Sequence, residues 1–398
     1  MDRHTWTVDE LESFRQHADP LADGVIAEIY QRGSVGAVND LLNAMVRSAE
    51  PPPAALPPAA REFFTRSAVL PDWLDPDAVR KGEEVFLRYG VLSLASLLCA
   101  SLPECYAMRN GVQVLSITQQ LGAHTERRIY ETAQMVINVM AYGGLLPDGR
   151  GVRSAQKVRL MHASMRYLLE VDPSGVDDPA PGVDTLASVM TRHVWNPAWG
   201  RPINQADMAF TLQTFSTVML RSWEQLGVVL DPAERDAYYH CWRVVGHVLG
   251  VDPRLNPPSR EGGLAVFQAV RAHQRGATPE GVAMTRALAD TVAQTLGIPW
   301  VSDDAVTLLM RHLLGDETAT MMGVPEASDV GELALDGITM IVRAASVVGE
   351  GIGDEIPLGH RISAWFGQKF LERVARLDAR GAGRLFHIPE SLRAAWAV

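Results

Sequence analysis

Residues 122–171 constrain the fold more than any other stretch of this chain. Apolar residues recur at helical spacing on both sides of the Gly-rich segment GGLLPDGRG (143–151), which predicts a helix, a tight turn and a second helix. The first helix carries a charged cluster, and the second carries His162 inside an apolar stripe. Two amphipathic helices joined this closely are expected to face each other.

The rest of the chain has the same periodicity, without the alternation of a β-strand and without a fixed-period repeat. Asn204, and Asp231 followed by Pro232, are typical helix starts. The pattern therefore predicts an all-α protein with one compact domain. Helices are expected as two within 8–48, and over 76–89, 91–108, 204–225, 231–251, 261–275, 279–296, 302–314, 331–348 and 362–378.

A proline-rich segment, AEPPPAALPPAA (49–60), interrupts this helical pattern near the N-terminus. Its five prolines cannot continue a helix and predict an extended connector. We therefore expect residues 1–60 to form an N-terminal helical extension with its connector, and residues 61–398 to form the main domain.

Composition narrows the classes of partner. The net charge of −11 argues against a nucleic-acid partner, and no Lys/Arg block offsets it. The N-terminal sequence has neither an apolar core nor twin arginines, so we expect a cytoplasmic protein. The apolar run 91–108 is shorter than the roughly 20 residues that cross a bilayer, so a buried helix is expected rather than a transmembrane segment. Three scattered cysteines predict neither disulfides nor a zinc site, and nothing predicts the oligomeric state.

The face of the second helix around His162 is apolar. Val158, Met161, Met165 and Leu169 share this face at helical spacing. A buried imidazole needs a polar partner, and an iron ion is one candidate. On spacing alone, a core histidine bonded to a carbonyl group is the better interpretation.

On the first helix, Arg128, Glu131 and Thr132 lie within about one turn and lead into an apolar stripe. Such a cluster marks either a helix end at the surface or the polar wall of a pocket, and the surface is the better interpretation from the pattern alone. Thr211 and Thr214, on a later helix, are candidates to line a pocket or to bond back to their own helix.

His240 and His247 lie seven residues apart on one helix, without a third metal ligand nearby in the sequence. We therefore interpret both as structural.

Four segments together resemble the rubber-oxygenase catalytic domain family, which includes the latex clearing proteins and the MpaB-type oxygenases. They lie in the family's order within about 99–251 and are RRIYETAQMV (127–136), GGLLPDGRGVRSAQKVRLMHASMR (143–166), WGRPINQADMAFTLQTFS (199–216) and AYYHCWRVVGHVLGV (237–251).

This resemblance implies a globin-like all-α domain that encloses non-covalent haem b, with His162 as the axial ligand of the iron. Arg128 and Thr132 match the family's distal motif, whereas Glu131 replaces the lysine of the best-known rubber oxygenases. We expect an open or water-bound distal site, with Glu131 as general base or as partner of Arg128. Glu104 is a further catalytic candidate, because the family has an acidic residue upstream of the arginine.

The resemblance also implies which residues near His162 would contact the haem. Val158, Met161 and Met165 would pack on the porphyrin, and Arg159 is a candidate for a haem propionate, since arginine binds carboxylates in a bidentate manner.

The function implied is a haem-dependent oxygenase that uses O2 on an apolar, alkene-containing small molecule of isoprenoid type, with oxidative cleavage of C=C. Two alternatives stay open at this point. One is a non-catalytic haem sensor or carrier, and the other is a haem-free helical protein that binds a lipid-like ligand.

Overall fold

The computed structural model describes residues 5–32, 56–120, 125–170, 194–296 and 303–326. Within these ranges the protein is helical, and its β content is one isolated bridge between Met108 and Arg275. The all-α prediction is confirmed. The predicted helices over 331–348 and 362–378, and the connector residues 49–55, lie outside the described residues.

The helices are α1 (Val8–Arg15), α2 (Pro20–Arg32), α4 (Pro58–Ser67), α5 (Pro76–Arg88), α6 (Gly90–Ser96), the π-helix η1 (Leu97–Ser101), α7 (Leu102–Tyr106), α8 (Gly111–Gln120), α9 (Thr125–Val139), α10 (Arg150–Glu170), the 3₁₀ turn η3 (Pro197–Trp199), α12 (Gln205–Gln225), α13 (Pro232–Leu249), the 3₁₀ turn η4 (Pro253–Leu255), α14 (Arg260–Gln274), α15 (Pro279–Leu296), α16 (Asp303–Leu314) and α17 (Asp316–Met321).

Helix α12 is the central element of the core. It packs against α13, α14 and η1, and two-thirds of its residues are buried, because apolar side chains such as Phe210, Val218 and Trp223 occur all round it. Its start is fixed by Asn204, whose side chain accepts a hydrogen bond from the Asp207 amide at 3.0 Å, as the sequence predicts.

Helix α13 also begins and ends where its sequence predicts. Asp231 and Glu234 form a reciprocal capping box, Pro232 occupies the first turn, and Gly250 ends the helix in the left-handed conformation at φ 77°. An N-terminal cap of this kind stabilises a helix by about 1 kcal/mol.

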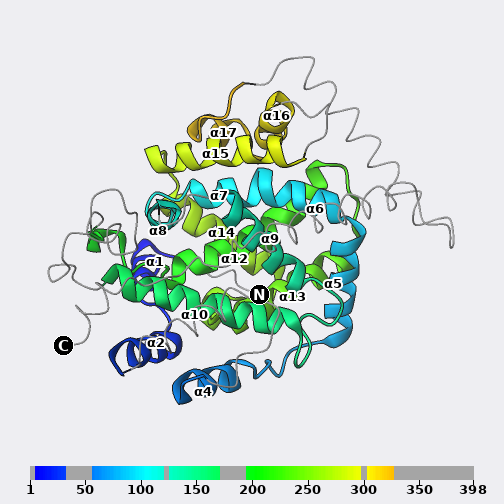
Figure 1. Ribbon diagram of the computed structural model, residues 1–398. Coiled ribbons are helices and arrows are strands. Elements are labelled where there is room, and N and C mark those ends of the chain that lie inside the picture. The colour runs from blue at the N-terminus through cyan, green and yellow to red at the C-terminus, as the bar shows by residue number, and fades with distance from the viewer. Residues whose placement is uncertain (1–4, 33–55, 121–124, 171–193, 297–302, 327–398) are drawn as a thin grey trace.

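Other helices cover this centre from three sides (Figure 1). Helix α5 packs along α13, while α2 and α4 form a layer beside α10. Helices α15, α16 and α17 lie over η1 and α7. Helices α1 and α2 are therefore part of the packed body, and the division at residue 60 stays a prediction.

The apolar run predicted as one buried helix forms α6, η1 and α7, and Leu97–Met108 are buried throughout. Among the described residues, no single helix is long and apolar enough to span a membrane; residues 76–88 and 92–106 meet the length and composition test only as a pair, bent by 88°.

Candidate functional site

Helices α9 and α10 are joined by a turn that brings their backbones into contact. A Cβ atom added to Gly151 would lie 2.6 Å from the Cα of Val139, and one added to Gly144 would lie 2.4 Å from the Asn138 carbonyl oxygen. Gly143 adopts φ 69°, a region that favours glycine. Because only glycine fits these positions, the Gly-rich sequence dictates a close antiparallel pair.

A buried carboxylate from α5 holds the turn in place. Glu83 is 2% exposed, and its Oε2 accepts a hydrogen bond from the Gly143 amide at 3.1 Å. Burial raises the pKa of the Glu83 carboxyl, against the opposing effect of the turn amides. No local sequence pattern identifies Glu83, because it lies 60 residues before its partner.

The register of the two helices follows from a second contact. Asn138 Nδ2 donates to Ser154 Oγ at 3.0 Å, in the buried seam between α9 and α10. His162 follows Gly151 by eleven residues, or three helical turns, so it lies on the same α9-facing stripe. Continuing the antiparallel register, the α9 positions opposite His162 are those around 128–132.

By this extrapolated register, the predicted distal cluster would lie on the segment opposite His162, and its assignment to the site stays a prediction. His162 and Thr132 are half-buried, and Glu131 is exposed. Arg128 lies in α9, and its side chain is outside the described part of the chain.

The residues flanking His162 divide between two parts of the core. Val158 packs against the main core, whereas Met161 and Met165 pack with α2 and α4, among side chains such as Ile26 and Phe63. These contacts place Met161 and Met165 in an apolar cluster that α10 shares with α2 and α4, and their contact with a porphyrin stays a prediction.

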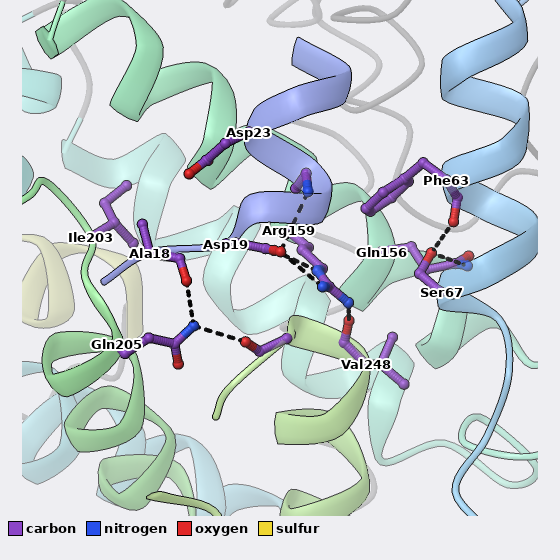
Figure 2. Close-up of polar contacts among 12 residues, drawn as sticks. Ala18, Asp19, Asp23, Phe63, Ser67, Gln156, Arg159, Ile203, Gln205 and Val248 are labelled. Carbon is purple, nitrogen blue, oxygen red and sulfur yellow. Dashed lines mark hydrogen bonds and ion pairs between the residues drawn. The ribbon is translucent and has the colours of Figure 1, made fainter. Parts of the chain in front are cut away.

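Arg159 is engaged elsewhere, as Figure 2 shows. Its Nη2 donates to Asp19 Oδ1 at 2.9 Å, and its Nη1 donates to the Val248 carbonyl at 3.1 Å. Arg166 likewise binds Asp23 of α2, at 2.7 Å. These hydrogen bonds connect α10 to α2 and α13. Arg159 would have to give up its bonds to Asp19 and Val248 before it could bind a haem propionate.

Glu104 is fully buried, and both of its oxygens bind arginines. Arg221 of α12 donates to Oε1 at 3.1 Å, and Arg271 of α14 donates to Oε2 at 3.0 Å. The Glu104 carboxylate therefore forms ion pairs with α12 and α14, and its catalytic role stays a prediction.

Of the two threonines on α12, Thr214 bonds back to its own helix. Thr214 donates back to the Thr211 carbonyl at 2.8 Å, and Thr211 itself is exposed.

His240 accepts the Asp75 amide proton at 3.1 Å, and burial, followed by the charge of Arg243, lowers the pKa of its imidazole. The His247 ring contacts the Val69 carbonyl at 3.1 Å. Both rings lie edge-on to Trp73, which confirms their structural interpretation.

The described residues contain no group of three His, Cys, Asp or Glu side chains that could hold a metal. A porphyrin supplies four nitrogen ligands itself, so a haem would need one axial nitrogen from the protein, and the half-buried His162 carries a nitrogen of that type.

The fold of the described residues is that of a helical protein. The family described as ER-bound oxygenase mpaB/B'/Rubber oxygenase, catalytic domain, matches residues 86–344, and the chain belongs to this family. It is an oxygenase by that membership.

Two relatives support the assignment. The rubber oxygenase of Streptomyces sp. (strain K30) is 28% identical over 321 residues, which cover 77% of this chain and 70% of that protein. The solved structure of latex clearing protein LCP in the closed state superimposes with a TM-score of 0.68 at 25% identity, covering 95% of this chain and 92% of that one.

Proposed function

We propose that this protein is a haem b-dependent oxygenase that uses O2 to cleave a C=C bond in an apolar substrate. The observation that supports the proposal is that His162 is half-buried on α10, which packs against α9, the helix that carries Arg128 and Thr132.

His162 would hold the iron through its imidazole, and Val158 and Met161 would contact the porphyrin. When bound, the haem supplies the activation of O2, a chemistry that amino-acid side chains lack. The protein's own part is to exclude water with the apolar faces of α9 and α10 and to present polar groups from one side.

Thr132 can donate a hydroxyl hydrogen bond to an oxygen atom on that side of the pocket. Glu131, being exposed, can hold or release a proton in exchange with solvent, and it is one helical turn from Arg128. These are the roles that we propose for the distal cluster.

The substrate class follows from the family and from chemistry. The relative's name gives rubber as what it acts on, and rubber is a hydrocarbon whose reactive group is the alkene. We propose a smaller isoprenoid-type alkene for this chain, and we retain a cytoplasmic location as part of the proposal.

An oxygen-electrode assay on haem-loaded protein tests this function. With squalene as the probe, we expect O2 consumption matched by formation of aldehyde or ketone products, detected with a carbonyl reagent. Reversible O2 binding with no carbonyl product from squalene or from shorter terpenoid alkenes would contradict the oxygenase proposal and favour a carrier or sensor.

A further inference from the structure

A cleft of about 560 Å³ lies between α12 and α14, with none of its lining on α9 or α10. Its volume is in the range of small-molecule sites, which is about 300–1,000 Å³. The lining includes two acids, Glu224 and Glu261, and five arginines: Arg221, Arg235, Arg260, Arg271 and Arg275.

At the inner end of the cleft, two arginines share one acid. Arg221 and Arg271 both bind the buried carboxylate of Glu104, at 3.1 Å and 3.0 Å. Two guanidinium charges against one carboxylate leave a positive charge that Glu104 does not neutralise. Because Glu104 is completely buried, it also fixes both guanidinium groups in position, as a preorganised anion site requires.

The remaining arginines are paired with acids that are mostly in solvent. Arg235 lies 3.8 Å from Glu224, which is 65% exposed, and Arg275 binds Glu317, which is 73% exposed. Ion pairs of this kind contribute little, so these acids are displaced easily by a ligand anion.

Apolar side chains lie between the charged ends of the cleft. Along α14, the lining residues at helical spacing are Arg260, Leu264, Phe267 and Arg271, over a rise of about 16 Å, and Arg275 follows directly after the helix. Leu264 is 39% exposed, in the middle of this series. The series offers cationic groups separated by an apolar surface.

We infer that this cleft binds an anionic amphiphile, with its carboxylate or phosphate head on Arg221 and Arg271 and its apolar chain along Leu264. Arginine binds both head groups in a bidentate manner, and the exposed leucine side chain gains from the removal of its apolar surface from water. The site is separate from the proposed haem site and does not depend on it.

Titration calorimetry on the full-length protein tests this inference, with decanoate, decyl phosphate and decanol as probes below their micelle concentrations. Decanoate, decyl phosphate or both should bind, and decanol should bind at least about tenfold more weakly, because it lacks the charge. The tighter of the two anions identifies the head group. R271Q and L264E should each weaken binding by about tenfold or more, whereas R80Q, at an exposed arginine of α5, should change it less than about twofold.

L264E changes an exposed side chain and leaves the Glu104 pairs intact, so it tests the site even if R271Q is poorly folded. Binding should also survive H162A, since that residue belongs to the other site. The inference is overturned if decanol binds as tightly as the anions, if L264E binds them like the wild type, or if H162A abolishes binding.

Discussion

Glu131 is the residue at which this chain departs from its best-known relatives, which carry a lysine there. The α9–α10 register places position 131 next to the level of His162. We predict that E131K gives the haem-loaded protein a low-spin, bis-nitrogen ferric spectrum, whereas the wild type is high-spin or water-bound and binds added imidazole. Absorption and EPR spectra measure the difference, with E62K on α4 as an exposed control. An E131K spectrum identical to that of the wild type would show that position 131 does not reach the iron.

Glu83 makes stability depend on pH. Burial raises the pKa of its carboxyl in the folded protein, so the folded state favours the protonated form. The contribution of Glu83 is therefore present below the unfolded pKa and is lost as pH rises through the folded pKa. Glutamine at this position can still accept the Gly143 hydrogen bond without carrying a charge.

We predict that the Tm of E83Q minus that of the wild type becomes more positive between about pH 4 and pH 8, since the unfolded pKa of glutamate is near 4.3. Thermal unfolding monitored by circular dichroism measures this, with E84Q on the same helix as the control. A difference that is constant across this pH range would contradict the prediction.

At the scale of elements, the contact between α9 and α10 depends on Gly151. An added Cβ would meet the backbone of Val139 at 2.6 Å, and backbone atoms cannot move away as a side chain can. G151A should therefore destabilise the protein by about 1–3 kcal/mol, and it should weaken haem retention by separating the helices.

Gly24 in α2 is the matched control, because an added Cβ there would meet nothing within 4 Å. G24A should stabilise the protein by about 0.5–1 kcal/mol, since alanine favours a helix interior over glycine. Urea unfolding measures both variants. Equal effects of the two substitutions would mean that the contact at Gly151 is not close.

The ion pair between Asp19 and Arg159 joins α2 to α10. Both side chains are largely buried, at 3% and 12% exposed. D19N should cost about 3 kcal/mol or more, because it leaves a guanidinium without its buried partner charge. D77N, which breaks the exposed Arg80 pair, should cost less than about 1 kcal/mol. Haem absorption that shifts in D19N without loss of stability would instead indicate that Arg159 acts at the cofactor.

At the scale of the whole molecule, the sequence predicts those features that depend on residues near one another in the chain, such as helix ends and buried helices. The caps at Asn204 and Asp231 and the burial of Leu97–Met108 follow from residues close together in the chain. The antiparallel α9–α10 pair follows from its glycines.

Long-range partners could not be predicted in this way. Arg159 pairs with Asp19, which is 140 residues away in the sequence, and Glu104 pairs with Arg271, which is 167 residues away. Such pairs depend on how helices pack, and a single sequence does not encode that in any local pattern. For the same reason, the sequence predicts Arg159 and Glu104 at the proposed site, whereas in the structure each side chain forms ion pairs with residues elsewhere in the fold. The cytoplasmic location and the division at residue 60 stay predictions.

The absorption spectrum of the purified protein tests the central claim most directly. We predict a Soret band at about one haem per chain, which changes on reduction with dithionite and on addition of imidazole. H162A should lose this band, whereas H247A, at an exposed histidine of α13, should keep it. Haem retained by H162A at wild-type stoichiometry and with a wild-type spectrum would contradict the assignment of His162 as the iron ligand.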